Sequence, residues 1–148
     1  MKNAQRLDPH VTQWVVQAAT RLTSTFAIVQ GVAIVGGGPA RWQGPAFATA
    51  LTVPGAPGSW GVVLFLFGAA GLAGTFTYRE RLVAAGMTGI CAWCMFFAMS
   101  FVKTAHENPR AATTGIWAYG FICLTALLLA GAYLQSQDGG QDGDELTQ

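Results

Sequence analysis

The chain has 148 residues, of which 52% are hydrophobic and 10% are charged, and its formal net charge is +1. About a quarter of the residues of an ordinary soluble domain are charged, so this composition is typical of a membrane protein. A near-neutral chain without a cluster of Lys and Arg excludes a nucleic-acid-binding surface. The composition therefore predicts an all-α integral membrane protein whose first partner is the lipid bilayer.

The first apolar segment ends at the glycine run 36–38, so it crosses a bilayer only if its helix begins well before Leu22. Asp8 and Pro9 form a typical helix start, because a capping carboxylate precedes a proline whose missing N–H costs nothing in the first turn. We expect a helix that begins in the interface and crosses the membrane over residues 14–35. A cleaved signal peptide is the alternative. It fits poorly, because the region before Leu22 is long, contains the acidic Asp8 and already has a helical pattern.

Three further segments are long enough to cross about 30 Å of hydrocarbon as helices. They cover residues 60–78, 82–102 and 114–134, and none contains a charged side chain. We therefore expect residues 1–135 to form one domain, a bundle of four transmembrane helices. The tail at residues 136–148 is rich in Gln, Gly and Asp, and we expect it to be disordered and acidic.

Basic residues in the connections predict the orientation. Five lie on the side of the two termini: Lys2, Arg6, Arg21, Arg79 and Arg81. Three lie on the other side: Arg41, Lys103 and Arg110. Because the side with more Lys and Arg faces the cytoplasm, we expect both termini to be cytoplasmic.

Residues 41–59 join the first two spans on the outer side and are too apolar for an ordinary surface loop. Pro45 and Pro54 enclose an apolar stretch that suits a helix of about two turns. Because a helix satisfies its own backbone, it rests in the interface without unpaired polar groups. We expect a short interfacial helix in this first outer loop, with a re-entrant hairpin lining a pore as the alternative.

Indole rings prefer the headgroup layer of a membrane, and Lys and Arg anchor the ends of spans there. The sequence therefore predicts membrane-interface anchors at six positions: Trp14, Trp42, Trp60, Trp117, Arg79 and Arg81.

Small residues recur along the second and third spans. Helices in lipid gain little from burying apolar surface, so close backbone approach through Gly and Ala decides where they pack. The short Arg-Glu-Arg connection makes these two spans an antiparallel hairpin. We expect helix packing at Gly68, Gly71, Gly74, Ala85 and Gly89. Their spacing leaves packing within one chain and packing between copies equally open.

Cys91 and Cys94 have the Cys-x-x-Cys spacing of many redox sites. Such pairs work near solvent at a helix start, whereas this pair lies mid-span, where thiols behave as inert small hydrophobes. Cys123 is expected at a similar depth on the fourth span, so a three-thiolate metal site is the alternative. We expect all three cysteines to be structural, with no metal and no cofactor.

The sequence contains no phosphate loop, serine elbow or His-Glu-x-x-His motif. All seven acidic residues lie outside the apolar spans, although proton-coupled transporters place ionisable groups inside the bundle. Arg21 intrudes on the first span, and its long stem is expected to carry the charge to the interface. We therefore expect no enzyme activity.

The chain resembles the small four-pass membrane proteins of actinobacterial phages, some of which are assigned as holins or holin-like. The resemblance rests on the four short spans, the basic turn at residues 79–81, the polar tail and the sequence VPGAPGSWG at residues 53–61. It implies a bacterial inner membrane, self-association into a homo-oligomer and membrane permeabilisation. A non-catalytic accessory subunit of a larger membrane complex is the main alternative, and an oligomeric channel or transporter is another.

Thiol labelling tests the orientation in a variant whose three native cysteines are replaced by Ser. A single cysteine at Gln43 should react with a membrane-impermeant thiol reagent on intact cells, because this residue is expected outside. A cysteine at Gln137 should react only after the cells are opened. The reverse pattern would contradict the orientation.

Overall fold

The computed structural model describes residues 9–38, 50–52, 54–107 and 114–141, with the single residues Trp42, Gly44 and Phe47. This part of the chain forms four long helices and the 3₁₀ turn η3, with these bounds: α1 Pro9–Gly36, η3 Ala50–Thr52, α2 Gly58–Thr77, α3 Glu80–Glu107 and α4 Thr114–Gln141. Each of the four α-helices is long and apolar enough to cross a membrane. The predicted all-helical fold with four such helices is confirmed.

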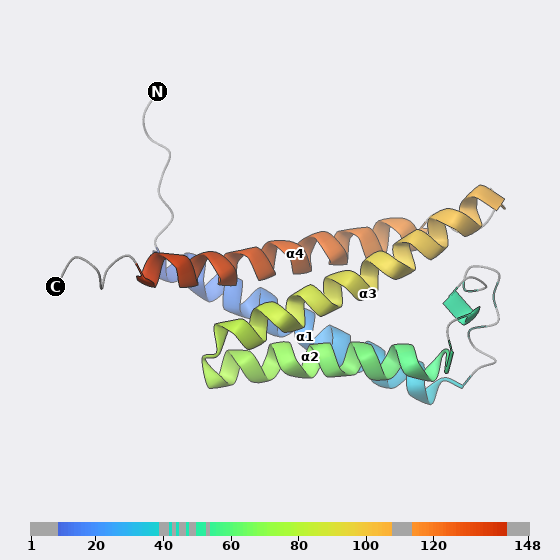
Figure 1. Ribbon diagram of the computed structural model, residues 1–148, viewed down its shortest axis with the longest axis horizontal. Coiled ribbons are helices and arrows are strands. Elements are labelled where there is room, and N and C mark those ends of the chain that lie inside the picture. The colour runs from blue at the N-terminus through green and yellow to red at the C-terminus, as the bar shows by residue number, and fades with distance from the viewer. Residues whose placement is uncertain are drawn as a thin grey trace, which may run out of the picture.

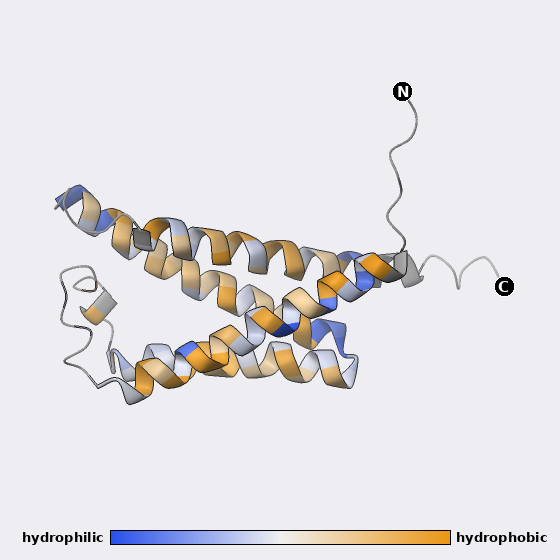
Figure 2. Ribbon diagram, turned by 180° about the vertical axis from the view of Figure 1, so that it is seen from behind, coloured by the Kyte–Doolittle hydropathy of each residue, from blue (hydrophilic) through white to orange (hydrophobic). Residues whose placement is uncertain are grey.

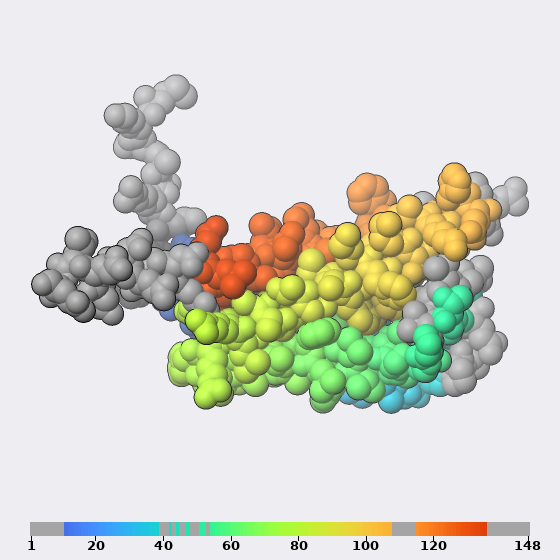
Figure 3. All heavy atoms as spheres, viewed as in Figure 1, coloured from blue at the N-terminus to red at the C-terminus, as the bar shows by residue number. Residues whose placement is uncertain are grey.

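Helices that follow one another along the chain pack on each other, while α1 contacts α3 and α4 only over short stretches. Figure 1 shows α2, α3 and α4 side by side, with α1 crossing behind them from the last turns of α4 to the first turns of α2. On this face the three front helices form a continuous surface (Figure 3). Hydrophilic residues gather at the helix ends and at isolated positions along α1 (Figure 2).

A two-residue turn joins α2 to α3, as the Arg-Glu-Arg segment predicts. Tyr78 caps α2 in the left-handed conformation, at φ 55° and ψ 30°. The amide of Arg79 donates to the carbonyl oxygen of Gly74 at 3.0 Å, which satisfies the end of α2. Glu80 follows in the first turn of α3, where a carboxylate is favourable. We call this end of the bundle the turn end and the opposite end the loop end.

α1 begins at Pro9, the helix start that the Asp8-Pro9 pair predicts, and its 28 residues rise about 42 Å, more than the roughly 30 Å of a hydrocarbon core. Two other helices are longer than the sequence predicts. α3 continues to Glu107, past the expected end of its span at residue 102. α4 continues to Gln141, into the residues expected to be disordered, because each residue added to an existing helix gains a hydrogen bond even where it is polar. Residues 142–148 of that predicted tail lie outside the described part of the chain.

The predicted interfacial helix falls largely on residues that the structure does not describe. Within residues 45–54 the structure describes Phe47, η3 and Pro54, and η3 is a single 3₁₀ turn. The interfacial helix and the re-entrant alternative therefore both stay predictions.

Aromatic rings fill the bundle toward the loop end. Trp93 and Phe97 of α3 stack with their ring centroids 4.1 Å apart, and Trp60 of α2 meets Phe97 edge-on at 5.0 Å. Tyr119 of α4 stacks on Phe101 at 5.5 Å. The indole Nε1 of Trp93 donates to the carbonyl oxygen of Trp60 at 3.1 Å. These rings therefore join α2, α3 and α4 in one cluster, which we call the aromatic cluster.

Replacing Trp93 by Phe should lower the free energy of unfolding by about 1 to 3 kcal/mol, because it removes a buried hydrogen bond and part of a packed ring. Trp117→Phe is the matched control, since Trp117 is 77% exposed. Unfolding of the detergent-solubilised protein by a denaturing detergent measures both changes. An equal loss of stability in the two variants would contradict a special role for Trp93.

Candidate functional site

The backbones of α2 and α3 touch at two glycines. A Cβ atom built on Gly86 would lie 2.5 Å from the amide nitrogen of Gly71 and 2.8 Å from the carbonyl oxygen of Phe67. A methyl group has no room at such distances, because non-bonded carbon atoms pack best at about 3.5 to 4.0 Å. Gly86 is therefore the residue that allows the closest approach of the two backbones within the α2–α3 hairpin.

The backbones of α1 and α2 also touch at glycines. A Cβ on Gly31 would lie 2.7 Å from the carbonyl oxygen of Gly61, and a Cβ on Gly61 would lie 2.6 Å from that of Gly31. Half-way along the helices, a Cβ on Gly68 would lie 2.8 Å from the carbonyl oxygen of Ser24. Small residues thus bring three consecutive helices into backbone contact, as expected for packing in lipid.

The four predicted glycines, Gly68, Gly71, Gly74 and Gly89, are buried inside the chain. Gly71 packs against Ser24 and Met87, Gly74 against Val83, and Gly89 against Phe67. These contacts use the glycine faces for packing within one chain, the first of the two alternatives that the sequence left open.

Ala85, the fifth predicted packing position, is exposed, and its neighbour Gly86 makes the contact instead. The residues of α3 that face the bundle around this position are Val83, Gly86, Met87 and Ile90, all buried. Helical residues three or four apart share a face, so Ala85 falls outside this stripe. The assignment of Ala85 to the packing face is therefore corrected to Gly86.

Ser24 of α1 lies where α1, α2 and α3 meet. Its side chain is fully buried, and its Oγ has no hydrogen-bond partner among the described residues. A Cβ on Gly71 would lie 2.7 Å from this Oγ. Sequence reasoning placed Ser24 on a short polar strip of the first helix and did not predict that Ser24 and Gly31, seven residues apart on one face of α1, pack against α2.

Most other buried hydroxyl groups bond to their own helix. Each donates to a backbone carbonyl oxygen three or four residues earlier at 2.8 to 3.0 Å: Thr20, Thr75, Ser100 and Thr104. A hydroxyl bonded in this way leaves no unsatisfied hydrogen-bond donor in the apolar interior. These hydroxyls therefore make a poor lining for a water path through one chain.

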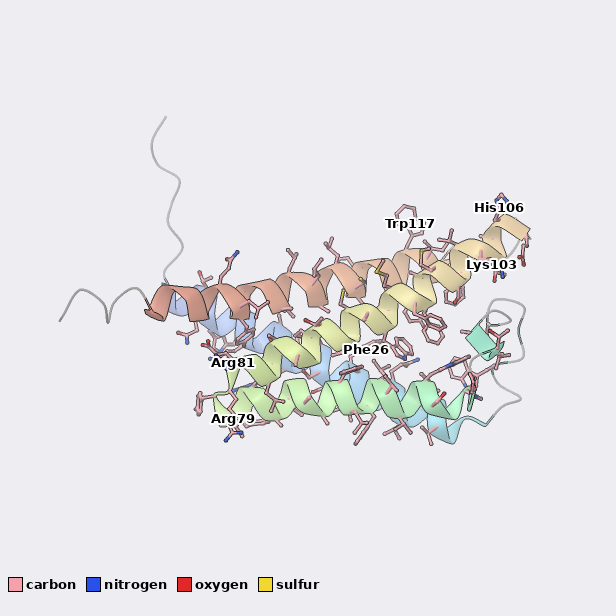
Figure 4. All side chains as sticks on the ribbon, viewed as in Figure 1. Phe26, Arg79, Arg81, Lys103, His106 and Trp117 are labelled. Atoms are coloured by element: carbon pink, nitrogen blue, oxygen red, sulfur yellow. The ribbon has the colours of Figure 1, made fainter. Side chains whose placement is uncertain are left out.

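Four of the predicted interface anchors are exposed. Trp14 is 70% exposed and Trp117 is 77% exposed, and Arg79 and Arg81 are exposed at the turn end (Figure 4). Trp60 differs, because only 4% of its surface is exposed.

Trp60 belongs to the aromatic cluster, so its assignment as an interface anchor is wrong for this chain. Trp42 is half-buried and meets Phe47 edge-on, with the ring centroids 5.0 Å apart. Phe47 in turn contacts Phe101 of α3 at 5.5 Å. Trp42 and Trp60, which were expected at the outer surface, thus pack against other aromatic rings of the bundle. Edge-to-face contact between two rings stabilises them beyond the burial of their surface area.

Arg21 is exposed, and its guanidinium carbon lies 5.3 Å from the ring centroid of Phe76. Phe76 is one residue before the end of α2, so the charge of Arg21 is near the turn end. A cation over an exposed aromatic face gains about 0.5 to 1 kcal/mol. This placement matches the expectation that Arg21 extends to the interface.

A cavity of about 500 Å³ lies at the turn end among all four helices. Polar side chains from each helix line it: Gln13 and Gln17 of α1, Thr75 of α2, Glu80 of α3 and Tyr133 of α4. Such a mixture of polar and apolar lining fits a small amphiphilic molecule. Sequence reasoning missed this cavity because its lining residues are far apart in the chain and share no motif.

The three cysteines do not form the three-thiolate site considered from the sequence. The Sγ atoms of Cys91 on α3 and Cys123 on α4 lie 3.1 Å apart, and Cys94 is buried in the core. Among the described residues, no group of three or more His, Cys, Asp and Glu side chains is placed to hold a metal ion. The structure instead brings together one pair of thiols from neighbouring helices.

Comparison with protein-family models, with curated proteins and with solved structures finds no match to this chain.

The glycine contacts predict a sharp difference between two Gly→Ala changes. Gly86→Ala should lower the free energy of unfolding by about 1 to 3 kcal/mol, because the added methyl group overpacks the contact with Gly71. Gly120→Ala should leave it unchanged or raise it by up to about 1 kcal/mol, since nothing lies within 4 Å of a Cβ there. Detergent unfolding measures both, and equal effects would contradict the contact.

Proposed function

We propose that this protein is a non-catalytic membrane protein that acts by packing against other copies of itself through the outer face of α4. We further propose that it lies in a bacterial inner membrane, with the turn end and both termini in the cytoplasm. The excess of basic residues on that side supports this orientation.

The proposed association surface is the outer face of α4. Six of its residues follow one another at spacings of three and four, so they share one face of the helix: Trp117, Gly120, Leu124, Leu127, Gly131 and Leu134. The four large ones are at least half exposed. A Cβ on Gly120 or Gly131 would have no neighbour within 4 Å, so both glycines leave room for a second helix.

The role of glycine elsewhere in the chain supports this interpretation. The buried glycines of α1, α2 and α3 all lie against another helix with no room for a Cβ atom, whereas a Cβ on Gly120 or Gly131 would have no neighbour within 4 Å. A glycine weakens a helix by about 1 kcal/mol relative to Ala, so its use on an exposed apolar face suits a close contact with a partner helix. The α2–α3 hairpin is a weaker candidate for association, because its own glycines are occupied.

Holin-like permeabilisation is the proposed outcome of this self-association. It draws its support from the resemblance to small four-pass phage proteins and from the open face of α4. Apart from the cavity at the turn end, the buried residues of one chain are mostly apolar, so a pore through the membrane would form between copies.

A non-catalytic accessory subunit of a larger membrane complex is the second candidate. The lack of a polar path within the described bundle favours it, because such a subunit needs only a surface on which to pack. In that case the outer face of α4 contacts a different protein.

Induced expression in an actinobacterial host tests the proposal. Wild type should depolarise the membrane abruptly after a lag, as followed with a potential-sensitive dye. Gly120→Leu should insert at an equal level yet delay or abolish that event, because the larger side chain fills the space for a partner helix. Gly36→Leu is the matched control, since Gly36 is also exposed with no neighbour within 4 Å, and it should behave as wild type.

A well-expressed wild type that leaves the membrane potential untouched would contradict autonomous permeabilisation. Co-purification of a foreign subunit in equal amount, lost in Gly120→Leu and kept in Gly36→Leu, would then favour the accessory subunit.

A further inference from the structure

The thiols of Cys91 and Cys123 are an isolated pair between two antiparallel helices. Their Sγ atoms lie 3.1 Å apart, close enough for one thiol to donate a hydrogen bond to the other. Both side chains are partly exposed on the side of the bundle, whereas Cys94, one turn further along α3, is only 1% exposed. A reagent from outside the bundle therefore reaches the pair more easily than it reaches Cys94.

The pair lies near the middle of the helices. Cys91 follows the start of α3 by 11 residues, about 16 Å along the helix axis at 1.5 Å per residue. In a bilayer with about 30 Å of hydrocarbon this is close to the midplane. Water-soluble oxidants are excluded from that depth, and lipid-soluble ones are not.

We propose that Cys91 and Cys123 form a disulfide when the membrane contains a lipid-soluble peroxide, such as an oxidised lipid; their close approach thus gives them a reactivity that the sequence, which predicts inert mid-span thiols, does not suggest. A disulfide has an S–S distance of about 2.05 Å, so the two sulfur atoms need to approach by about 1 Å. Both side chains are partly exposed, so their rotation can supply this movement.

The reaction has two steps that balance in atoms and electrons. The sulfur of one thiol attacks the O–O bond of the peroxide: an S–O bond forms, the O–O bond breaks, and an alcohol leaves with a proton. The second thiol attacks the resulting sulfenic acid: the S–S bond forms, the S–O bond breaks, and water leaves. Two thiols and one peroxide become one disulfide, one alcohol and one water, so the sulfur atoms are oxidised and the peroxide is reduced.

The disulfide would tie α4 to α3 at mid-depth. It closes a chain segment from Cys91 to Cys123, which includes the α3–α4 connection, and closing a segment of this size stabilises the folded state. It would also fix the rotation of α4 and hence the direction of its outer face. This inference does not depend on the proposed function, because it rests only on the distance and exposure of two thiols.

Peptide mapping of the full chain in liposomes tests the proposal. The protein is treated with cumene hydroperoxide, its free thiols are blocked in denaturant, and non-reduced peptides are analysed by mass spectrometry. The Cys91–Cys123 cross-linked peptide should dominate, with Cys94 recovered as a free, blocked thiol. Cys123→Ser should abolish the cross-link, and the matched control Cys94→Ser should retain it.

Met99 on the same helix is 61% exposed, so its oxidation reports that the peroxide has reached the bundle. Free Cys91 and Cys123 in a sample with oxidised Met99 would overturn the proposal. A dominant link to Cys94 or between two chains would overturn it as well.

Discussion

The contact between the backbones of Gly71 and Gly86 is the constraint on which the rest of the bundle depends. Between helices in lipid there is little hydrophobic gain, so van der Waals contact at short range has to supply the packing energy. Gly31 with Gly61, and Gly68 with the backbone of Ser24, repeat this contact between α1 and α2. Three consecutive helices are thereby held by their backbones, and their side chains project outward or fill the remaining space.

α4 is held in a different way. Its contacts with α3 come from side chains, through Tyr119 in the aromatic cluster and the thiol of Cys123 beside Cys91. Its glycines are free of neighbours at Gly120 and Gly131. The bundle thus combines three helices joined by contacts at glycines with a fourth helix that packs as extensively on α3 through side chains and has an open outer face. Our functional proposal places association on that open face because the inner glycine faces are already in use.

The helices themselves were predictable, since an uncharged apolar run of about 20 residues has few alternatives to a spanning helix. The α2–α3 hairpin was also predictable, because the Arg-Glu-Arg segment is too short for any other path. The rotation of a helix about its own axis was harder to predict. Ala85 and Gly86 differ by one position in sequence but by about 100° around the helix. The sequence contains both small residues and does not say which one faces α2.

Contacts between distant segments were beyond sequence reasoning. A tryptophan at the end of a span, such as Trp60, is typical of an interface anchor. Only its contact with Phe97 shows that it is buried in the aromatic cluster. The sequence placed Cys123 at about the depth of Cys91 and Cys94, but which of these two thiols it meets depends on how α3 and α4 are aligned. The cavity at the turn end likewise exists only because four helix ends meet.

Cross-linking between copies in native membranes distinguishes association through the outer face of α4 from association through the α2–α3 hairpin. In a variant without native cysteines, single cysteines are placed at exposed positions of α4 (Gly120, Leu124) and of α2 (Val62, Leu66). We expect dimers to cross-link through the α4 positions and not through the α2 positions. Cross-linking through α2, or at none of the four positions, would contradict the assignment of α4 as the association face.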